Sequence, residues 1–195
     1  MSILLGFAME AILICLAAGM KGGLVPPVPF VADLIQKVSW SFLVCVGLAF
    51  GTAVAKARPT FMGAMGLLAA PVAFAAAKAA HKGAAAALGL AAVAGGPSAL
   101  LVALVKTAQY GVFGWVLGRI SSRTGAPLRL YAAVGLACGV VFGGIISLLI
   151  AQAGASGVGL VTKGINEILF PLGCSLVLYV SDALRPAPAP TPPAQ

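Results

Sequence analysis

An apolar stretch with a single charge near its middle sets the strictest limit on how this chain folds. Residues 97–118 read PSALLVALVKTAQYGVFGWVLG, which is long enough for the ~20 residues that cross a bilayer's hydrocarbon core. Pro97 and Ser98 are typical of a helix start. Lys106 lies near the centre, where a cation costs at least ~2.5–3.5 kcal/mol on the scale derived from insertion experiments. The stretch therefore predicts a transmembrane helix whose lysine meets a carboxylate or water.

Composition extends this conclusion to the whole chain. Of the 195 residues, 61% are hydrophobic and only 8% are charged, whereas soluble domains average about 25% charged residues. We expect an all-α integral membrane protein with one transmembrane helical domain over residues 1–185 and a disordered Pro-rich tail over 186–195. The net charge of +8 is read as a topology signal in the loops rather than as a nucleic-acid footprint.

The other apolar stretches predict a polytopic bundle of about seven (six to seven) transmembrane helices. The uncertain segment is 83–93, GAAAALGLAAV, which either crosses as a short helix or forms a re-entrant segment. Residues 24–37 are predicted to form a Pro-rich connection, and 153–163 a loop of small residues. The remaining helices are expected at about 2–20, 38–55, 60–77, 97–118, 130–152 and 168–184.

Two groups of polar or aromatic residues are assigned to the membrane surface. Ser39-Trp40 opens the second predicted helix, and a tryptophan there is typical of the membrane interface. Lys78, His81 and Lys82 are assigned to a solvated basic loop after the third.

The basic residues orient the predicted helices through the positive-inside rule. If seven helices cross and the N-terminus lies outside, eight Lys or Arg residues fall inside and three outside. Omitting the short segment would spoil this bias, because all later loops would change sides. We therefore expect an outside or lumenal N-terminus and a cytoplasmic C-terminus, in a membrane that the sequence does not identify. The inner set is Lys21, Lys37, Lys78, Lys82, Arg119, Arg123, Arg129 and Arg185, and the outer set is Lys56, Arg58 and Lys163.

Glu10 places a second charge inside the membrane, near the centre of the first predicted helix. At 1.5 Å per residue, Glu10 and Lys106 each lie ~12 Å from the starts of their helices. Because both helices begin outside in the predicted topology, the two side chains could pair. They are either a fold-specifying ion pair or the lining of a polar path. Asn166 and Glu167, before the last predicted helix, are either an interfacial helix start or a vestibule that concentrates cations.

Glycines mark one helix in each half of the chain. Each glycine-rich helix is followed by a helix interrupted by a proline, Pro71 or Pro171. This order hints at two related three-helix halves, a plan common in pores and carriers. The glycines serve either close helix packing or kinked points along an ion path. Those assigned to the path are Gly47, Gly51, Gly139, Gly143 and Gly144.

The order of these features resembles the trimeric intracellular cation channels, the TRIC family. The resemblance implies a bundle of three, three and one helices that assembles as a homotrimer with one pore for K⁺ and Na⁺ in each subunit. It also implies a role for Lys106 in gating or lipid contact. The matching features, in chain order, are Glu10 and Lys21, Ser39-Trp40, Pro97 with Lys106, the glycines from 139 to 144, and Asn166-Glu167-Ile168-Leu169.

These observations favour transport over catalysis. The sequence contains one His and none of the spacings typical of catalytic triads, metal ligands or phosphate-binding loops, so we expect no enzyme, no cofactor and no metal. The leading hypothesis is a channel for small monovalent cations, with membrane lipids and further copies of the chain, in a homo-oligomer, as partners. The alternatives are a proton-coupled secondary transporter of a small solute and a non-transporting subunit of a larger membrane complex.

Overall fold

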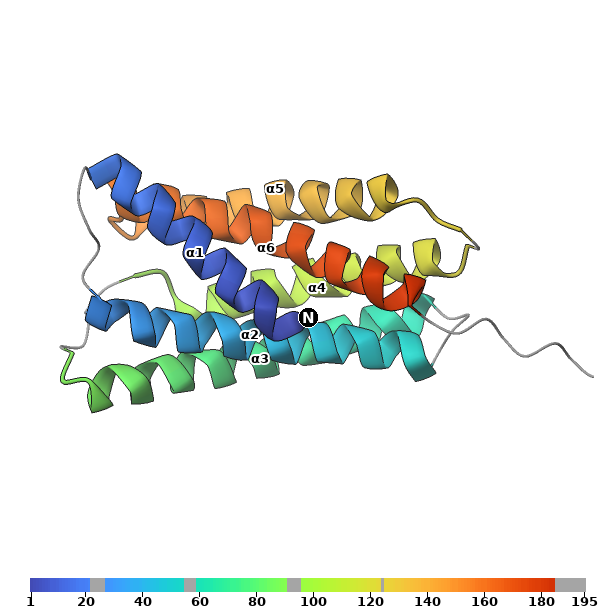
Figure 1. Ribbon diagram of the computed structural model, residues 1–195, viewed down its shortest axis with the longest axis horizontal. Coiled ribbons are helices and arrows are strands. Elements are labelled where there is room, and N and C mark those ends of the chain that lie inside the picture. The colour runs from blue at the N-terminus through green and yellow to red at the C-terminus, as the bar shows by residue number, and fades with distance from the viewer. Residues whose placement is uncertain (22–26, 55–58, 91–95, 124, 185–195) are drawn as a thin grey trace, which may run out of the picture.

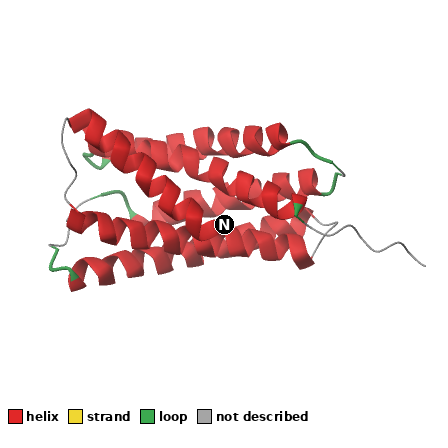
Figure 2. Ribbon diagram, viewed as in Figure 1, coloured by secondary structure: helices red, strands yellow, loops and turns green. Residues whose placement is uncertain are grey.

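The computed structural model describes residues 1–21, 27–54, 59–90, 96–123 and 125–184. This part of the chain is helical, without strands, and six of its helices are long and apolar enough to cross a membrane (Figure 2). The predicted all-α class is confirmed for these residues, and the length and composition of the helices are consistent with an integral membrane protein. The helices are α1 (Ser2–Lys21), α2 (Pro27–Val54), α3 (Pro59–Ala87), α4 (Ala99–Ser121), α5 (Leu128–Gln152) and α6 (Gly157–Ala183) (Figure 1).

The six helices form a closed bundle. Each helix packs against the next in the chain, and α1 also packs against α6, so the ring of contacts closes. Inside the ring, α2 contacts α4 and α6. Large apolar side chains such as Leu68 (65% exposed), Leu100 (70%) and Leu148 (65%) point away from the bundle. In an integral membrane protein these outer faces contact lipid.

The second helix begins eleven residues earlier than expected, at Pro27 rather than at Val38. Pro27 and Pro29 both lie in its first turn, where the missing N–H group has no partner to lose. The predicted loop over 24–37 is therefore wrong for residues 27–37, while residues 24–26 lie outside the described part. As a consequence, Asp33 and Lys37 are helical residues, and the Lys37 side chain is largely buried in the bundle.

The last helix also starts early, at Gly157 instead of Ile168. Small residues made 153–163 look like a loop, but glycine is common in transmembrane helices because lipid leaves the backbone no other hydrogen-bond partner. Asn166 and Glu167 consequently lie about 13–15 Å along α6, not at its entrance. Pro71 and Pro171 both remain inside continuous helices.

The described part of the short predicted segment does not form a helix of its own, so the described helices number six, the lower of the two predicted counts. Residues 83–87 are the last turns of α3, which ends in a Schellman motif. Gly89 takes the left-handed position at φ +67°, and the Leu90 N–H donates to the Ala85 carbonyl at 2.9 Å. Residues 91–93 of the predicted segment, and the predicted disordered tail over 186–195, lie outside the described residues.

The first helix occupies only part of the bundle's length. Ser41, in the middle of α2, donates a hydrogen bond from Oγ to the Ser2 carbonyl at 2.5 Å. From there α1 runs, more tilted than its neighbours, towards the end where α2 begins (Figure 1). We call that end of the bundle the far end, and the opposite end, where α6 finishes, the terminal end.

If all six described helices cross the membrane, the helix directions do not fit the expected topology. Helices α1 and α6 run in opposite directions, so the start of α1 and the finish of α6 both point towards the terminal end (Figure 1). An N-terminus outside and a C-terminus inside requires an odd number of crossings. Because residues 83–87 continue α3, the number of described helices is even.

Candidate functional site

The centre of the candidate site is an ion pair between Lys106 on α4 and Glu167 on α6. Lys106 Nζ lies 2.5 Å from Glu167 Oε2, and the two side chains are only 10% and 15% exposed. Lys106 is seven residues and Glu167 ten residues from the far-end starts of their helices, which corresponds to roughly 10 and 15 Å. Both charges therefore lie within the apolar length of the bundle, where pairing offsets part of their cost.

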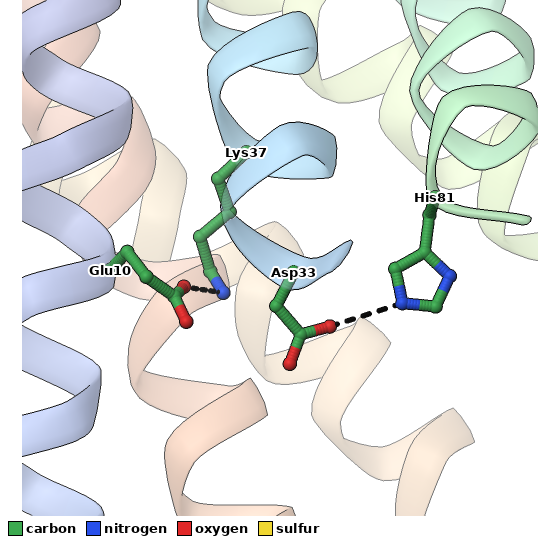
Figure 3. Close-up of polar contacts among 4 residues, drawn as sticks. All are labelled: Glu10, Asp33, Lys37 and His81. Carbon is green, nitrogen blue, oxygen red and sulfur yellow. Dashed lines mark hydrogen bonds and ion pairs between the residues drawn. The ribbon is translucent and has the colours of Figure 1, made fainter. Parts of the chain in front are cut away.

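A second ion pair joins Glu10 on α1 to Lys37 on α2 (Figure 3). The side chain of Glu10 is 6% exposed and that of Lys37 is 18% exposed. Lys37 lies ten residues after the start of α2, and Glu10 lies eleven residues before the end of α1. Counted from the far end, both are roughly 15 Å into the bundle. We call these four residues, Glu10, Lys37, Lys106 and Glu167, the charge layer.

The expected pair of Glu10 with Lys106 is wrong. The expectation assumed that the helices carrying them start on the same side, but α1 runs towards the far end whereas α4 starts there. Glu10 pairs instead with Lys37 on α2, and Lys106 pairs with Glu167 on α6. Lys37 had been placed in a loop and Glu167 at a helix entrance, because the starts of α2 and α6 had been set too late.

Trp40 contacts the Lys106–Glu167 pair from the helix that carries Lys37. It follows Lys37 by one helical turn on α2, and Lys106 Nζ lies 4.7 Å from the centre of its ring. The ring also makes edge contacts with Phe74, Tyr110 and Phe170, at centroid distances of 6.5, 5.6 and 6.3 Å. Trp40 is 8% exposed, so its predicted place at the membrane interface is wrong. The late helix start again caused the error.

Two amide side chains lie next to the charge layer, Gln109, which was not singled out from the sequence, and Asn166, which was assigned to a vestibule or a helix start. Gln109 is 1% exposed, and neither its Nε2 nor its Oε1 has a hydrogen-bond partner among the described residues. The Oδ1 atom of Asn166 is likewise buried and has no hydrogen-bond partner among the residues that the structure describes. Gln109 follows Lys106 by one turn, and Asn166 precedes Glu167. A glutamine inside a predicted apolar helix was the available signal for the first of them.

A half-exposed pair lies between the charge layer and the far end. His81 Nε2 on α3 lies 3.2 Å from Asp33 Oδ1 on α2, with side chains 35% and 50% exposed (Figure 3). Asp33 precedes Lys37 by four residues, so the two share one face of α2. His81 had been assigned to a solvated loop, but it belongs to α3 and faces α2. Titratable groups therefore extend from the far-end surface towards Glu10.

Four of the five glycines assigned to an ion path are packing residues. A Cβ atom at Gly47 would lie 2.5 Å from Ala69 Cβ on α3, and one at Gly51 would lie 3.1 Å from Met62 Cγ. On α5, a Cβ at Gly139 would lie 2.0 Å from the Ile168 carbonyl oxygen, and one at Gly143 would lie 2.8 Å from the Glu167 carbonyl carbon. Gly144 differs, because nothing lies within 4 Å of its Cβ position.

Two thiols meet across the same interior. Cys45 on α2 and Cys174 on α6 are both buried, with their sulfur atoms 3.5 Å apart. Within the described part of the chain, no group of three or more His, Cys, Asp or Glu side chains could hold a metal ion. The polar interior is thus built from ion pairs, amides, thiols and aromatic rings.

Comparison of the chain with protein-family models, with curated proteins and with solved structures finds no match. The resemblance to the trimeric intracellular cation channels therefore stays a prediction, and the argument for function depends on the site itself.

Proposed function

We propose that the protein is a proton-coupled membrane carrier of a small monovalent cation. The observation that carries the proposal is the Lys106–Glu167 ion pair, 2.5 Å long, with side chains 10% and 15% exposed. Ionisable residues inside membranes are costly and are found mainly along ion and proton pathways. A carboxylate that binds either a cation or a proton can couple the movement of one to the other.

The surroundings of Lys106 suit a pair that opens and closes. When Glu167 takes up a proton, its carboxylate becomes neutral and no longer attracts the ammonium. The Trp40 ring, 4.7 Å from Nζ, remains as a partner for the cation, and such a contact contributes up to about 2 kcal/mol when it is desolvated. Lys106 thus keeps a partner in both states of Glu167, the carboxylate in one and the weaker ring contact in the other.

The packing of the helices divides the bundle into two units that the Lys106–Glu167 pair bridges. Glycines bring the backbones of α1 and α2, of α2 and α3, of α3 and α4, and of α5 and α6 into contact; a Cβ at Gly66 on α3, for example, would lie 2.0 Å from the Tyr110 carbonyl oxygen. Such contacts favour rigid movement of α1–α4 and of α5–α6. Lys106–Glu167 joins these two units, whereas Glu10–Lys37 lies within the first. Carriers commonly work by movement of one such unit against another.

The cation channel expected from the sequence is the competing hypothesis. The channel hypothesis starts from the same two lysines at mid-depth. Each lysine is neutralised by a carboxylate, however, and four of the five glycines assigned to the path are in tight contacts. A subunit that does not transport, with the ion pairs serving only stability, is the third hypothesis. The homotrimer implied by the family resemblance belongs with the channel hypothesis, and the mass of the detergent-solubilised protein measured by light scattering tests it.

We further propose that the terminal end faces the cytoplasm. Outside the two ion pairs the chain has ten Lys and Arg residues. Counted along the sequence with six crossings, six of them fall next to helix ends that lie at the terminal end, and the other four fall on the side of the far end. The positive-inside rule places the richer side in the cytoplasm. The six are Lys56, Arg58, Arg119, Arg123, Arg129 and Arg185.

Ion exchange in proteoliposomes tests the carrier proposal. Purified protein is reconstituted with a trapped pH-sensitive dye, and an outward K⁺ or Na⁺ gradient is imposed without an ionophore. We expect proton uptake driven by the cation gradient, and loss of this uptake in Glu167→Gln. The control is Asp182→Asn, which removes a carboxylate in the last turn of α6, where Asp182 accepts a hydrogen bond from Tyr131 at 3.2 Å. This variant should keep its exchange.

The alternative outcomes separate the hypotheses. Cation flux that moves protons only after a protonophore is added would replace the carrier with a channel. Absence of movement with either cation, for protein whose helicity and melting are intact, would contradict transport of monovalent cations. Equal loss of exchange in Glu167→Gln and Asp182→Asn would show that the charge layer has no special role.

A further inference from the structure

A basic hollow lies at the terminal end of the bundle, away from the charge layer. It has a volume of about 260 Å³ and is lined by Pro59, Arg119, Ser122 and Arg123. Pro59 is the first residue of α3, whereas Arg119 lies in the last turn of α4 and the other two directly follow that helix. The hollow is therefore formed where one helix begins and its packed neighbour ends.

The base of this hollow is held rigidly. Gly118 brings α4 so close to α3 that a Cβ atom at this position would lie 2.8 Å from the Cα atom of Pro59. The guanidinium carbon of Arg119 lies 4.5 Å from the centre of the Trp115 ring. Stacking on a tryptophan restricts the arginine's rotamers. One of the two cationic groups is thus positioned before any ligand arrives.

The lining matches the chemistry of a phosphate group. Two arginine guanidiniums present planar forks of N–H donors, which suit phosphate oxygens in bidentate geometry. The start of α3 contributes the positive end of a helix dipole, while the Ser122 hydroxyl donates to the Arg119 carbonyl at 2.9 Å. The lining contains no carboxylate. An anion with several oxygen acceptors is the ligand that these groups favour.

The position of the hollow selects a lipid as the source of the phosphate. Trp115 and Val112 continue from Arg119 along α4 towards the membrane interior, and they are 42% and 49% exposed. An exposed tryptophan next to arginines at a helix end is typical of the headgroup level, and basic sites between transmembrane helices bind anionic headgroups. An acyl chain below the headgroup would lie against these apolar side chains.

From these observations we infer that the hollow binds the phosphate of an anionic glycerophospholipid in the leaflet at the terminal end. The two arginines hold the phosphate, and the Val112–Trp115 face of α4 contacts the acyl chains. The inference is independent of the proposed carrier activity, because none of its residues belongs to the charge layer.

Native mass spectrometry of the detergent-purified protein, titrated with phosphatidylglycerol or phosphatidylcholine, tests the site. We expect phosphatidylglycerol to bind more tightly than phosphatidylcholine. The double variant Arg119→Gln/Arg123→Gln should bind phosphatidylglycerol about tenfold or more weakly, because two interfacial cations are lost. The matched control, Lys82→Gln/Lys163→Gln, removes two exposed cations near the far end and should bind like the unchanged protein.

Three results would overturn the inference. The first is equal affinity for the two lipids, and the second is equal weakening in the two double variants, since both would show that overall charge is sufficient. The third is complete displacement of phosphatidylglycerol by excess inorganic phosphate, which would make free phosphate the ligand. Circular dichroism of each variant shows that it is folded. If the arginine pair fails to fold, Ser122→Leu, which obstructs the hollow without changing charge, replaces it and should weaken phosphatidylglycerol binding.

Discussion

Substituting alanine for Gly139 is expected to disrupt the bundle more than its single methyl group suggests. The added Cβ atom would lie 2.0 Å from the carbonyl oxygen of Ile168, whereas ordinary contacts of this kind begin at 3.4 Å. The obstacle is backbone, so no side chain can rotate away. Helices α5 and α6 would have to separate by roughly 1 Å or more around this contact, because packed interiors resist local expansion.

The size of the effect follows from two opposing terms. Overpacking costs about 1–3 kcal/mol, with the upper value appropriate where backbone must move. Alanine in place of glycine returns about 1 kcal/mol through its higher helix propensity. The net loss is about 2 kcal/mol, which corresponds to a fall in melting temperature of about 4–8 °C for a chain of this size. Nothing lies within 4 Å of the Cβ position at Gly144, so Gly144→Ala should be unchanged or slightly more stable.

Thermal melting of the two variants in one detergent, followed by the fluorescence of buried Trp40, makes the comparison. Gly144→Ala is the matched control because it is the same substitution on the same helix. Equal melting temperatures for Gly139→Ala and Gly144→Ala would refute the close contact between α5 and α6. A lower melting temperature for Gly144→Ala alone would show that the face of α5 carrying Gly144, and not the face carrying Gly139, packs against α6.

Two further predictions concern the ion pair and a helix end. Glu167→Gln should destabilise the protein by about 3–5 kcal/mol, because the buried ammonium of Lys106 loses its counter-charge, and adding Lys106→Met should restore most of this loss in melting experiments. A double variant no more stable than Glu167→Gln would contradict the pairing. Gly89→Ala should lower the stability by about 1 kcal/mol because Gly89 has φ +67°. Gly83→Ala lies inside α3 and has no neighbours within 4 Å, so it should raise the stability by up to about 1 kcal/mol in the same assay. Equal changes in stability at the two sites would contradict the end of α3 described here.

The sequence predicted the class of fold and the residues with unusual burial, because hydrocarbon imposes simple rules on composition. Low charge content and long apolar runs indicate membrane helices whatever their contacts. An isolated Lys106 or Glu10 in such a run must find a partner, and both do. These conclusions depend on single residues and their local surroundings, which the sequence states directly.

Helix boundaries and partners could not be read in the same way. Prolines at 27 and 29 looked like breaks, although a proline in the first turn of a helix is tolerated. Small residues at 157–163 looked like a loop, although lipid favours helix for almost any composition. Because the starts of α2 and α6 were predicted too late, Lys37 and Glu167 were predicted at the surface although they lie in the interior. The wrong pairing of Glu10 with Lys106 followed from these displacements and from a helix count that reversed the direction of α4.

The contact between Cys45 and Cys174 has a practical consequence. Their sulfur atoms, 3.5 Å apart, belong to helices in the two different packed units, and 129 positions separate them in the chain. The protein thus carries a native cross-linking reporter of the distance between the two packed units. Oxidation by a mild chemical oxidant would trap the arrangement described here, and conditions that favour another arrangement would slow the trapping.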